Sequence, residues 1–153
     1  RGRRLMSIWS WTLEAYARPD VPDACLALQD AHGQNTPFLL WAIWAEGPPA
    51  EVLAKGAALA KAWEAEVLSP IRTVRRRLKE DFAPVDAGAR LALREDIKAA
   101  ELRAERLLME TLADLVGQHK GGVPALAALE AASAAWGRTA PLDALARLAG
   151  PLT

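Results

Sequence analysis

Alanine and leucine dominate this chain, whereas the β-branched residues that favour strands are scarce. The chain contains 33 Ala and 23 Leu in 153 residues, against 7 Val and 4 Ile. Ala and Leu lose little side-chain freedom in a helix, while β-branched side chains suit a sheet. A hydrophobic content of 52% with zero net charge excludes a disordered chain. The sequence therefore predicts an all-α protein.

Proline and glycine divide the chain into helical stretches. Proline suits the first turn of a helix and glycine its C-terminal end, so their positions mark helix boundaries. The predicted helices cover residues 7–17, 20–33, 36–47, 48–79, 86–116, 124–136 and 141–149. Helix 36–47 carries apolar residues on every side, which indicates a central place in the core. We expect residues 1–153 to form a single domain, a compact bundle of about five to seven helices.

The two longest predicted helices are expected to pair with each other. Helix 48–79 has apolar residues at intervals of three and four positions, interrupted by Ser69-Pro70. The proline should cause a kink, or a break at which Ser69 caps a new helix. In helix 86–116 the predicted seam is Leu93, Ile97, Ala100, Ala104, Leu107, Thr111 and Leu115. A short proline-containing turn joins the two helices, which predicts a long antiparallel hairpin at about 49–116.

The cysteine content and the length of the apolar stretches indicate a cytoplasmic protein outside the membrane. Cys25 is the single cysteine and cannot form an internal disulfide. The longest stretch without a charged residue, 31–45, is shorter than the ~20 apolar residues of a spanning helix. The amino end has the outline of a signal peptide, but Glu14 lies where the cleavage region should be neutral. Because the chain does not begin with Met, we expect Met6 to be the natural start and residues 1–6 to be disordered or an added leader.

The sequence offers little for metal binding or catalysis. His32, His119 and Cys25 are the nitrogen and sulfur ligands available, and none occurs in Glu-x-x-His or Cys-x-x-Cys spacing. No glycine-rich phosphate-binding loop follows a predicted strand. We expect no metal, no cofactor and no catalytic residues, and we favour a protein without enzymatic activity.

A polar segment between the second and third predicted helices is the first candidate binding site. It contains Gln29, Asp30 and His32, and Trp41 and Trp44 follow in the next helix. These polar groups would orient a small ligand or substrate against the indole rings. In the alternative interpretation, polar residues of this segment cap the adjoining helix ends and the tryptophans belong to the core.

A run of cations near the end of helix 48–79 is the second candidate. Arg72, Arg76 and Lys79 recur at helical spacing beside the apolar seam, and Arg75 joins them. We call these four residues the basic stripe. Five cations and one acid between positions 69 and 80 give a local charge of +5 − 1 = +4, which suits contact with RNA or phosphate.

The predicted hairpin also supplies acids that would neutralise part of the basic stripe. If the chain turns near residue 84, Arg72 should lie opposite Glu95 and Asp96. The helix dipole also stabilises cations near a helix C-terminus, so the basic stripe can have a structural role without binding a partner. Zero net charge argues against a dedicated nucleic-acid-binding protein, because phosphate affinity depends on accumulated positive charge.

The first predicted helix is a candidate surface for a homodimer or another partner, although we expect most of the six tryptophans to belong to the core. Trp9 and Trp11 are two positions apart and therefore point to different sides of that helix. If one side is core, the other is exposed or contacts a partner. Our leading prediction is a non-enzymatic protein-interaction module that binds a protein partner or itself through the first helix and the basic stripe. The pocket at Gln29, Asp30 and His32, with or without enzymatic activity, and RNA or phosphate binding by the stripe are the alternatives.

Several segments resemble a family of small proteobacterial helical proteins known as a domain of unknown function. The most distinctive is Cys-Leu-Ala-Leu-Gln-Asp-Ala-His-Gly at 25–33. Segments 11–19, 39–44, 70–79 and 101–106 are similar as well, so that the resemblance extends over about residues 8–110. It implies a bacterial cytoplasmic protein and brings no activity with it.

Overall fold

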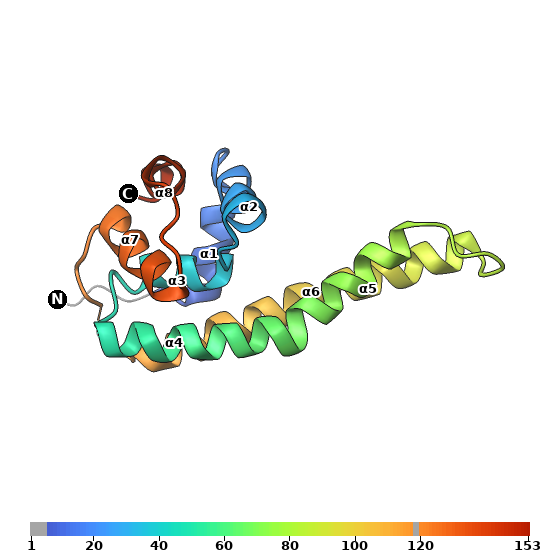
Figure 1. The fold of residues 1–153 in the computed structure, drawn as a ribbon, viewed down its shortest axis with the longest axis horizontal. Helices are drawn as coiled ribbons and strands as arrows, with labels where there is room; N and C mark the ends of the chain where they lie inside the picture. Colours follow the sequence, from blue (N-terminus) through green and yellow to red (C-terminus); the bar gives the residue numbers. More distant parts are fainter. Residues whose placement is uncertain (1–5, 118–119) are drawn as a thin grey trace.

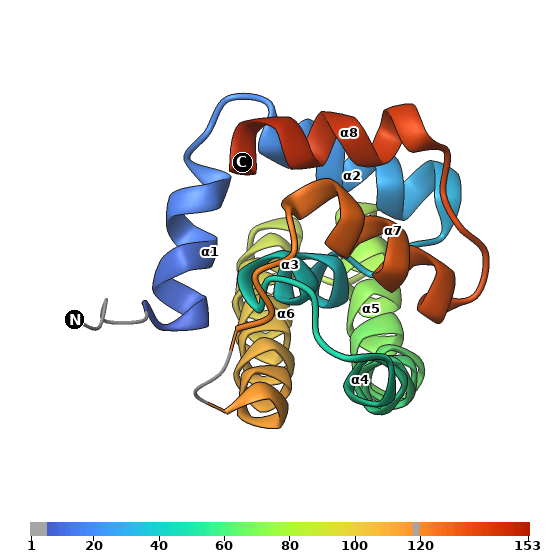
Figure 2. The same ribbon diagram turned by 90° about the vertical axis from the view of Figure 1, so that its left-hand side faces the viewer.

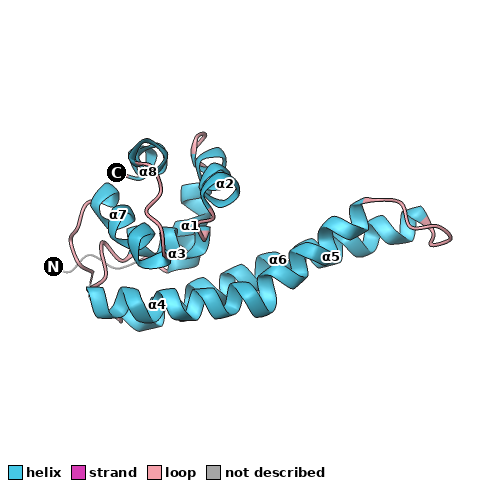
Figure 3. Ribbon diagram, viewed as in Figure 1, coloured by secondary structure: helices cyan, strands magenta, loops and turns pink. Residues whose placement is uncertain are grey.

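The computed structural model describes residues 6–117 and 120–153. These residues form helices joined by turns and loops, with no strand among them, so the predicted all-α fold is confirmed (Figure 3). The expectation for residues 1–5 of the leader lies outside the described residues. The elements in chain order are α1 (Ile8–Tyr16), α2 (Val21–His32), α3 (Thr36–Trp44), α4 (Ala50–Trp63), the π-helix η1 (Glu64–Leu68), α5 (Ser69–Lys79), α6 (Ala87–Val116), α7 (Ala125–Trp136), α8 (Leu142–Ala149) and the 3-10 turn η2 (Gly150–Leu152).

Several helices begin at a polar cap or end at a glycine where the sequence predicts a helix boundary. The Ser7 Oγ accepts a hydrogen bond from the N–H of Ser10 at 3.2 Å, and the Asn35 Oδ1 accepts one from the N–H of Phe38 at 2.9 Å. Gly33 ends α2 with a φ of 62°, a conformation that glycine adopts without strain. These local bonds satisfy backbone groups that the helix itself leaves unpaired.

Helix α3 is the centre of the bundle, as its apolar sequence predicts. All nine of its residues are buried. It contacts α1, α2, α4, α6 and α7, and Figure 2 shows it surrounded by other helices. The approach of α4 depends on Gly56, because a Cβ atom there would lie 2.7 Å from the ring of Trp41.

The predicted hairpin extends from Ala50 to Val116, with α4, η1 and α5 antiparallel to α6. Asp86 begins α6 by accepting the N–H of Ala89 at 2.8 Å. Figure 1 shows that α5 and the first part of α6 project away from the remaining helices as an arm. Apolar spacing predicts that two helices pair but does not indicate how much of the pair other helices cover, so the sequence does not predict this projection.

The helix continues through Ser69-Pro70, so of the two predicted alternatives, a kink or a break, the break is wrong. Ser69 has helical dihedral angles and its N–H bonds to the carbonyl of Glu64, five residues back. The chain is therefore helical without interruption from α4 through η1 into α5, which gives seven continuous helical runs among the described residues. In a π-turn, the backbone hydrogen bond joins residues that are five positions apart instead of four. This wider turn accommodates Pro70, which would strain a regular α-helix.

The predicted seam of α6 is only partly right. Leu93 and Leu107 are exposed by 48% and 55%, whereas Leu108, Met109 and Leu112 are buried. The reason is that α6 has several neighbours: it packs on α5 along the arm and on α1, α3 and α4 along its second half. One apolar face with helical spacing therefore cannot make all of these contacts, and residues on other faces of α6 are buried as well.

Candidate functional site

A cavity of about 350 Å³ lies between α1, α3 and α6. We call it the α1–α6 pocket. Its lining is mainly apolar, with one carboxylate, and consists of Trp9, Thr12, Leu13, Tyr16, Thr36, Pro37, Leu40, Leu102, Glu105 and Met109. A volume of this size is at the lower end of the range for ligand sites in proteins.

Helical spacing brings these residues together. The lining residues of α1 lie at positions 9, 12, 13 and 16, which is one face of a helix, and those of α6 lie at 102, 105 and 109. The first turn of α3 closes the pocket, with Thr36, Pro37 and then Leu40. The pocket thus forms where two amphipathic helices meet the end of the central helix.

The two threonine hydroxyl groups of the pocket are engaged in structural bonds. The Thr12 Oγ1 donates to the Ile8 carbonyl oxygen at 2.8 Å and lies 3.7 Å from the Met109 Sδ. The Thr36 Oγ1 donates to the carbonyl oxygen of Cys25 at 3.4 Å. Neither hydroxyl is paired with a side chain that would activate it as a nucleophile.

Bulky apolar side chains surround the mouth of the pocket and remain exposed. Leu13 and Leu102 are exposed by 56% and 53%, and Tyr16 by 39%. On the same side, the guanidinium of Arg106 lies over the ring of Trp9 at 5.5 Å from the ring centre. The mouth therefore presents a patch of apolar surface beside an aromatic ring that already accepts a cation.

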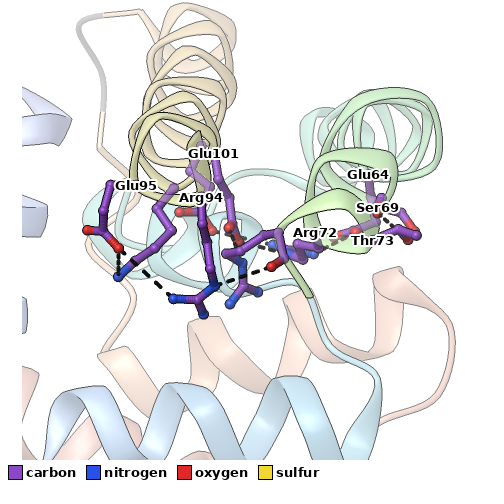
Figure 4. Close-up of polar contacts among 10 residues, drawn as sticks. Glu64, Ser69, Arg72, Thr73, Arg94, Glu95 and Glu101 are labelled. Atoms are coloured by element: carbon purple, nitrogen blue, oxygen red, sulfur yellow. Dashed lines mark hydrogen bonds and ion pairs between the residues drawn. The ribbon is translucent and has the colours of Figure 1, made fainter. Parts of the chain in front are cut away.

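An ion-pair network joins the pocket to the hairpin, and its centre is Arg72 (Figure 4). The guanidinium donates to Glu64 at 2.7 Å, to Glu101 at 3.1 Å and to Glu105 at 3.4 Å. The Arg75 Nε lies 2.7 Å from the second oxygen of Glu101. Three carboxylates thus face two guanidinium groups, and Arg72 is itself buried.

The network also reaches the beginning of α3. The Asn35 Nδ2 donates to the Glu64 Oε1 at 3.1 Å, while the Oδ1 of the same amide caps α3 at Phe38. Glu64 therefore bonds Arg72 with one oxygen and Asn35 with the other. The contact fixes the central helix against the π-helix.

Burial and charge shift two groups in this network. Burial raises the pKa of Glu105 above its ordinary value of 4.5, Arg72 opposes this, and the negative charges of Glu101 and Glu64 add to it. For Arg72, burial lowers the pKa, but Glu64, Glu105 and Glu101 more than offset this and the pKa is raised. Arg72 therefore stays charged, whereas Glu105 binds a proton more readily than an ordinary glutamate does.

The structure separates the members of the predicted basic stripe. Arg72 is buried and Arg75 is half-buried, and both pair with carboxylates of α6. Arg76 and Lys79 are exposed, and in the described part of the chain their side chains form no ion pair. Two of the four predicted contact residues are thus accessible cations.

The predicted partners of Arg72 are wrong: it contacts Glu101 and Glu105, not Glu95 and Asp96. Helical side chains lean toward the N-terminus of their own helix. In an antiparallel pair, the side chain of Arg72 therefore leans toward higher positions of α6, and the glutamates of α6 lean back toward it. Counting residues from the turn does not include this tilt of the side chains, so it predicts partners at positions that are too low in α6.

Gln29, Asp30 and His32 do not meet Trp41 and Trp44 in the structure. Gln29 is half-buried, and Asp30 and His32 are exposed on α2. His32 lines a cavity with Ala31, Gly33, Arg138, Thr139, Ala140 and Pro141, and neither tryptophan belongs to that set. The indole that comes close is Trp136, whose Nε1 donates to the Gly33 carbonyl oxygen at 2.9 Å.

The two predicted tryptophans serve the core. Trp41 is fully buried, with its ring centre 5.6 Å from that of Phe38. Trp44 is buried as well, and its Nε1 donates to the Met6 carbonyl oxygen at 3.0 Å. These placements agree with the alternative interpretation, in which the tryptophans pack in the interior.

Sequence reasoning missed the residues that make the α1–α6 pocket, notably Tyr16 and Glu105. Tyr16 also adjoins the buried Cys25: burial raises the pKa of this thiol to about 11, and a hydrogen bond with Tyr16 partly offsets the effect. The spacing of large side chains along α1 was the available signal, because it leaves Leu13 and Tyr16 on a second, unassigned face. Glu105 carries no such signal in a helix rich in charged residues.

Among the described residues, no group of His, Cys, Asp and Glu side chains is arranged to hold a metal ion. No helix in this part of the chain has the length and apolar character needed to span a membrane.

Comparison with known proteins assigns the chain to a family. A family model described as a protein of unknown function (DUF2390) matches residues 7–112. No curated protein and no solved structure matches the chain. The family match includes α1 to α5 and most of α6, so it contains the whole α1–α6 pocket and the Arg72 network, whereas α7 and α8 lie beyond it. The chain therefore belongs to this family of proteins of unknown function.

Proposed function

We propose that the chain is a non-enzymatic protein-interaction module and that the α1–α6 pocket with its rim is the partner-binding surface. The observation that supports this most directly is the exposure of Leu13, Tyr16 and Leu102 around an apolar cavity. Large apolar side chains gathered at a cavity mouth are typical of binding surfaces. The hydroxyl groups bonded to backbone carbonyls favour binding over catalysis.

The partner is a helix of another protein that lays apolar side chains along the rim and inserts one into the pocket. This is the helix-in-groove mode of recognition. A second copy of this chain fits less well, because a symmetric contact through this face would bring two carboxylate-rich networks together. The pocket is lined by α1, which is the helix that the sequence favours as the partner surface.

The alternatives have less support. RNA or phosphate contact through the basic stripe relies on Arg76 and Lys79, since Arg72 and Arg75 are engaged by carboxylates. The cavity at His32 lacks the indole walls expected for the ligand site at Gln29, Asp30 and His32. We infer a bacterial cytoplasmic location, for which the unpaired Cys25 and the family resemblance are the support.

Site-specific photocrosslinking in the native host tests the proposal. A photoreactive residue at Leu13 should crosslink a discrete protein, and one at Leu142, an equally exposed leucine of α8, should not. The captured protein is then purified and its affinity measured. We expect Leu13→Glu and Leu102→Glu to weaken binding by roughly tenfold or more, as for anchor positions of interfaces, and Leu142→Glu to leave it unchanged. Equal crosslinking from both positions, or equal affinities of all three variants, contradicts the proposal.

A further inference from the structure

We infer that the side chain inserted into the α1–α6 pocket is a lysine or arginine whose cationic group pairs with Glu105. The inference rests on the proposed function and specifies the chemistry of the partner at the same site. Three properties of the pocket support it: the charge of the network behind it, the incomplete pairing of Glu105, and the shape of the apolar lining.

The network has one more negative charge than positive charge. Glu64, Glu101 and Glu105 face Arg72 and Arg75. Glu105 lines the pocket, so a side chain inserted there comes near the carboxylate excess. A cation would compensate this charge, whereas an acidic side chain would increase it.

Glu105 is the least well paired of the three carboxylates. Its contact with Arg72 is 3.4 Å long, compared with 2.7 Å for Glu64 and 3.1 Å for Glu101. Glu101 also pairs with Arg75 and Glu64 also accepts from Asn35, whereas Glu105 lines the pocket and has Arg72 as its one hydrogen-bond and ion-pair partner among the described residues. The raised pKa of Glu105, caused first by burial, agrees with a carboxylate that lacks a full partner.

The walls of the pocket suit a long side chain with an apolar stem and a charged end. Leu13, Leu102 and Met109 provide contacts for methylene groups, and Tyr16 provides an aromatic face for a cation. A purely apolar side chain would fill the cavity but would bury Glu105 further without giving it a second partner, at a cost in free energy. Lysine and arginine satisfy both the walls and the carboxylate.

Selection from a displayed library of helical peptides tests the inference even while the natural partner is unidentified. The wild-type chain is the bait, and peptides are kept when Leu13→Glu abolishes their binding. We expect these peptides to share a lysine or arginine at one position. Replacing that residue by the neutral isostere norleucine should weaken binding to the wild-type chain by roughly tenfold or more.

The matched bait variant is Glu105→Gln, with Glu110→Gln as its control on α6, where Glu110 is half-buried and pairs with Arg106 outside the Arg72 network. The norleucine effect should fall below about threefold on Glu105→Gln and persist on Glu110→Gln, because the coupling belongs to one pair of charges. Circular dichroism checks that both variants are folded.

The two proposals fail in distinguishable ways. Selected peptides that depend on Leu13 but have no shared basic residue, or a norleucine effect that persists on Glu105→Gln, overturn the cationic anchor and leave the interaction surface intact. A library that yields no Leu13-dependent peptide contradicts the interaction surface itself.

Discussion

The guanidinium of Arg72 bonds the carboxylate of Glu64 at 2.7 Å, although the two residues are eight positions apart in one continuous helix. In an unbroken α-helix, eight residues turn about 80° past two full turns, which would place the two side chains on different faces. The π-helix η1 takes more residues per turn, so it reduces this angle and aligns Glu64 with Arg72. The irregular turn is thus what completes the ion-pair network.

Arg72→Met should lower the free energy of unfolding by about 3–5 kcal/mol, because it leaves Glu64, Glu101 and Glu105 without their shared cation. Urea unfolding followed by circular dichroism measures the change. Arg76→Met is the control: Arg76 is exposed, and the substitution should change stability by no more than about 0.5 kcal/mol. Similar losses for the two variants would show that the network does not stabilise the fold.

Glu105→Gln should alter how stability depends on pH. The folded pKa of Glu105 is raised above its ordinary value of 4.5, with burial as the first cause. The folded state therefore binds the proton more tightly than the unfolded state, and stability falls as the pH rises from about 4.5 through the folded pKa. The facing charged groups are Arg72 of α5, Glu64 of η1 and Glu101 of α6 itself, and Tyr16 of α1 is the further titratable neighbour.

Unfolding curves between about pH 4 and pH 7 give the measurement, since acid-linked stability changes fall in that range. Relative to the wild-type chain, Glu105→Gln should become progressively more stable as the pH rises. A difference between the wild-type chain and Glu105→Gln that stays constant over this range would contradict the raised pKa.

Gly56→Ala should destabilise the protein by about 1–3 kcal/mol, the usual cost of overpacking a core. A Cβ atom at position 56 would lie 2.7 Å from the ring of the fully buried Trp41, and neither helix can move away freely. Thermal and urea unfolding measure the loss. At Gly88, in the first turn of α6, the nearest atom is 3.4 Å away, so Gly88→Ala should be neutral or stabilise by up to about 1 kcal/mol. A stabilising Gly56→Ala would mean that α3 and α4 pack less closely than described.

Cys25 should react slowly with thiol reagents in the folded protein. Burial raises its pKa from 9.0 to about 11, which lowers the thiolate fraction at neutral pH roughly 100-fold. The rate of modification by a disulfide reagent at pH 8 should therefore be at least about 100-fold lower in native buffer than in urea. Equal rates in the two solvents would contradict the buried position of this thiol.

Much of the fold could be predicted from sequence because the relevant interactions are local. Asn35, Gly33 and Asp86 end or begin helices through bonds within a few residues of themselves. The apolar residues on every side of α3 predicted its central position, since a helix without a polar face must be buried. The excess of alanine and leucine argued against a sheet, because the preference of these residues for a helix is also a local property of the chain.

The candidate site could not be predicted, because it depends on contacts between residues far apart in the chain. Thr12 and Met109, which meet in the α1–α6 pocket, are 97 positions apart. The predicted partners of Arg72 are wrong because side chains lean along their helices. The predicted alternative of a break at Ser69 is wrong because a π-turn accommodates the proline within a continuous helix. The sequence alone thus determined which segments are helical and which helix is central. The packing of α1 and α6 on the end of α3 decided where the pocket lies and which carboxylate faces it, since the relative placement of helices follows from the fit of their side chains over the whole bundle.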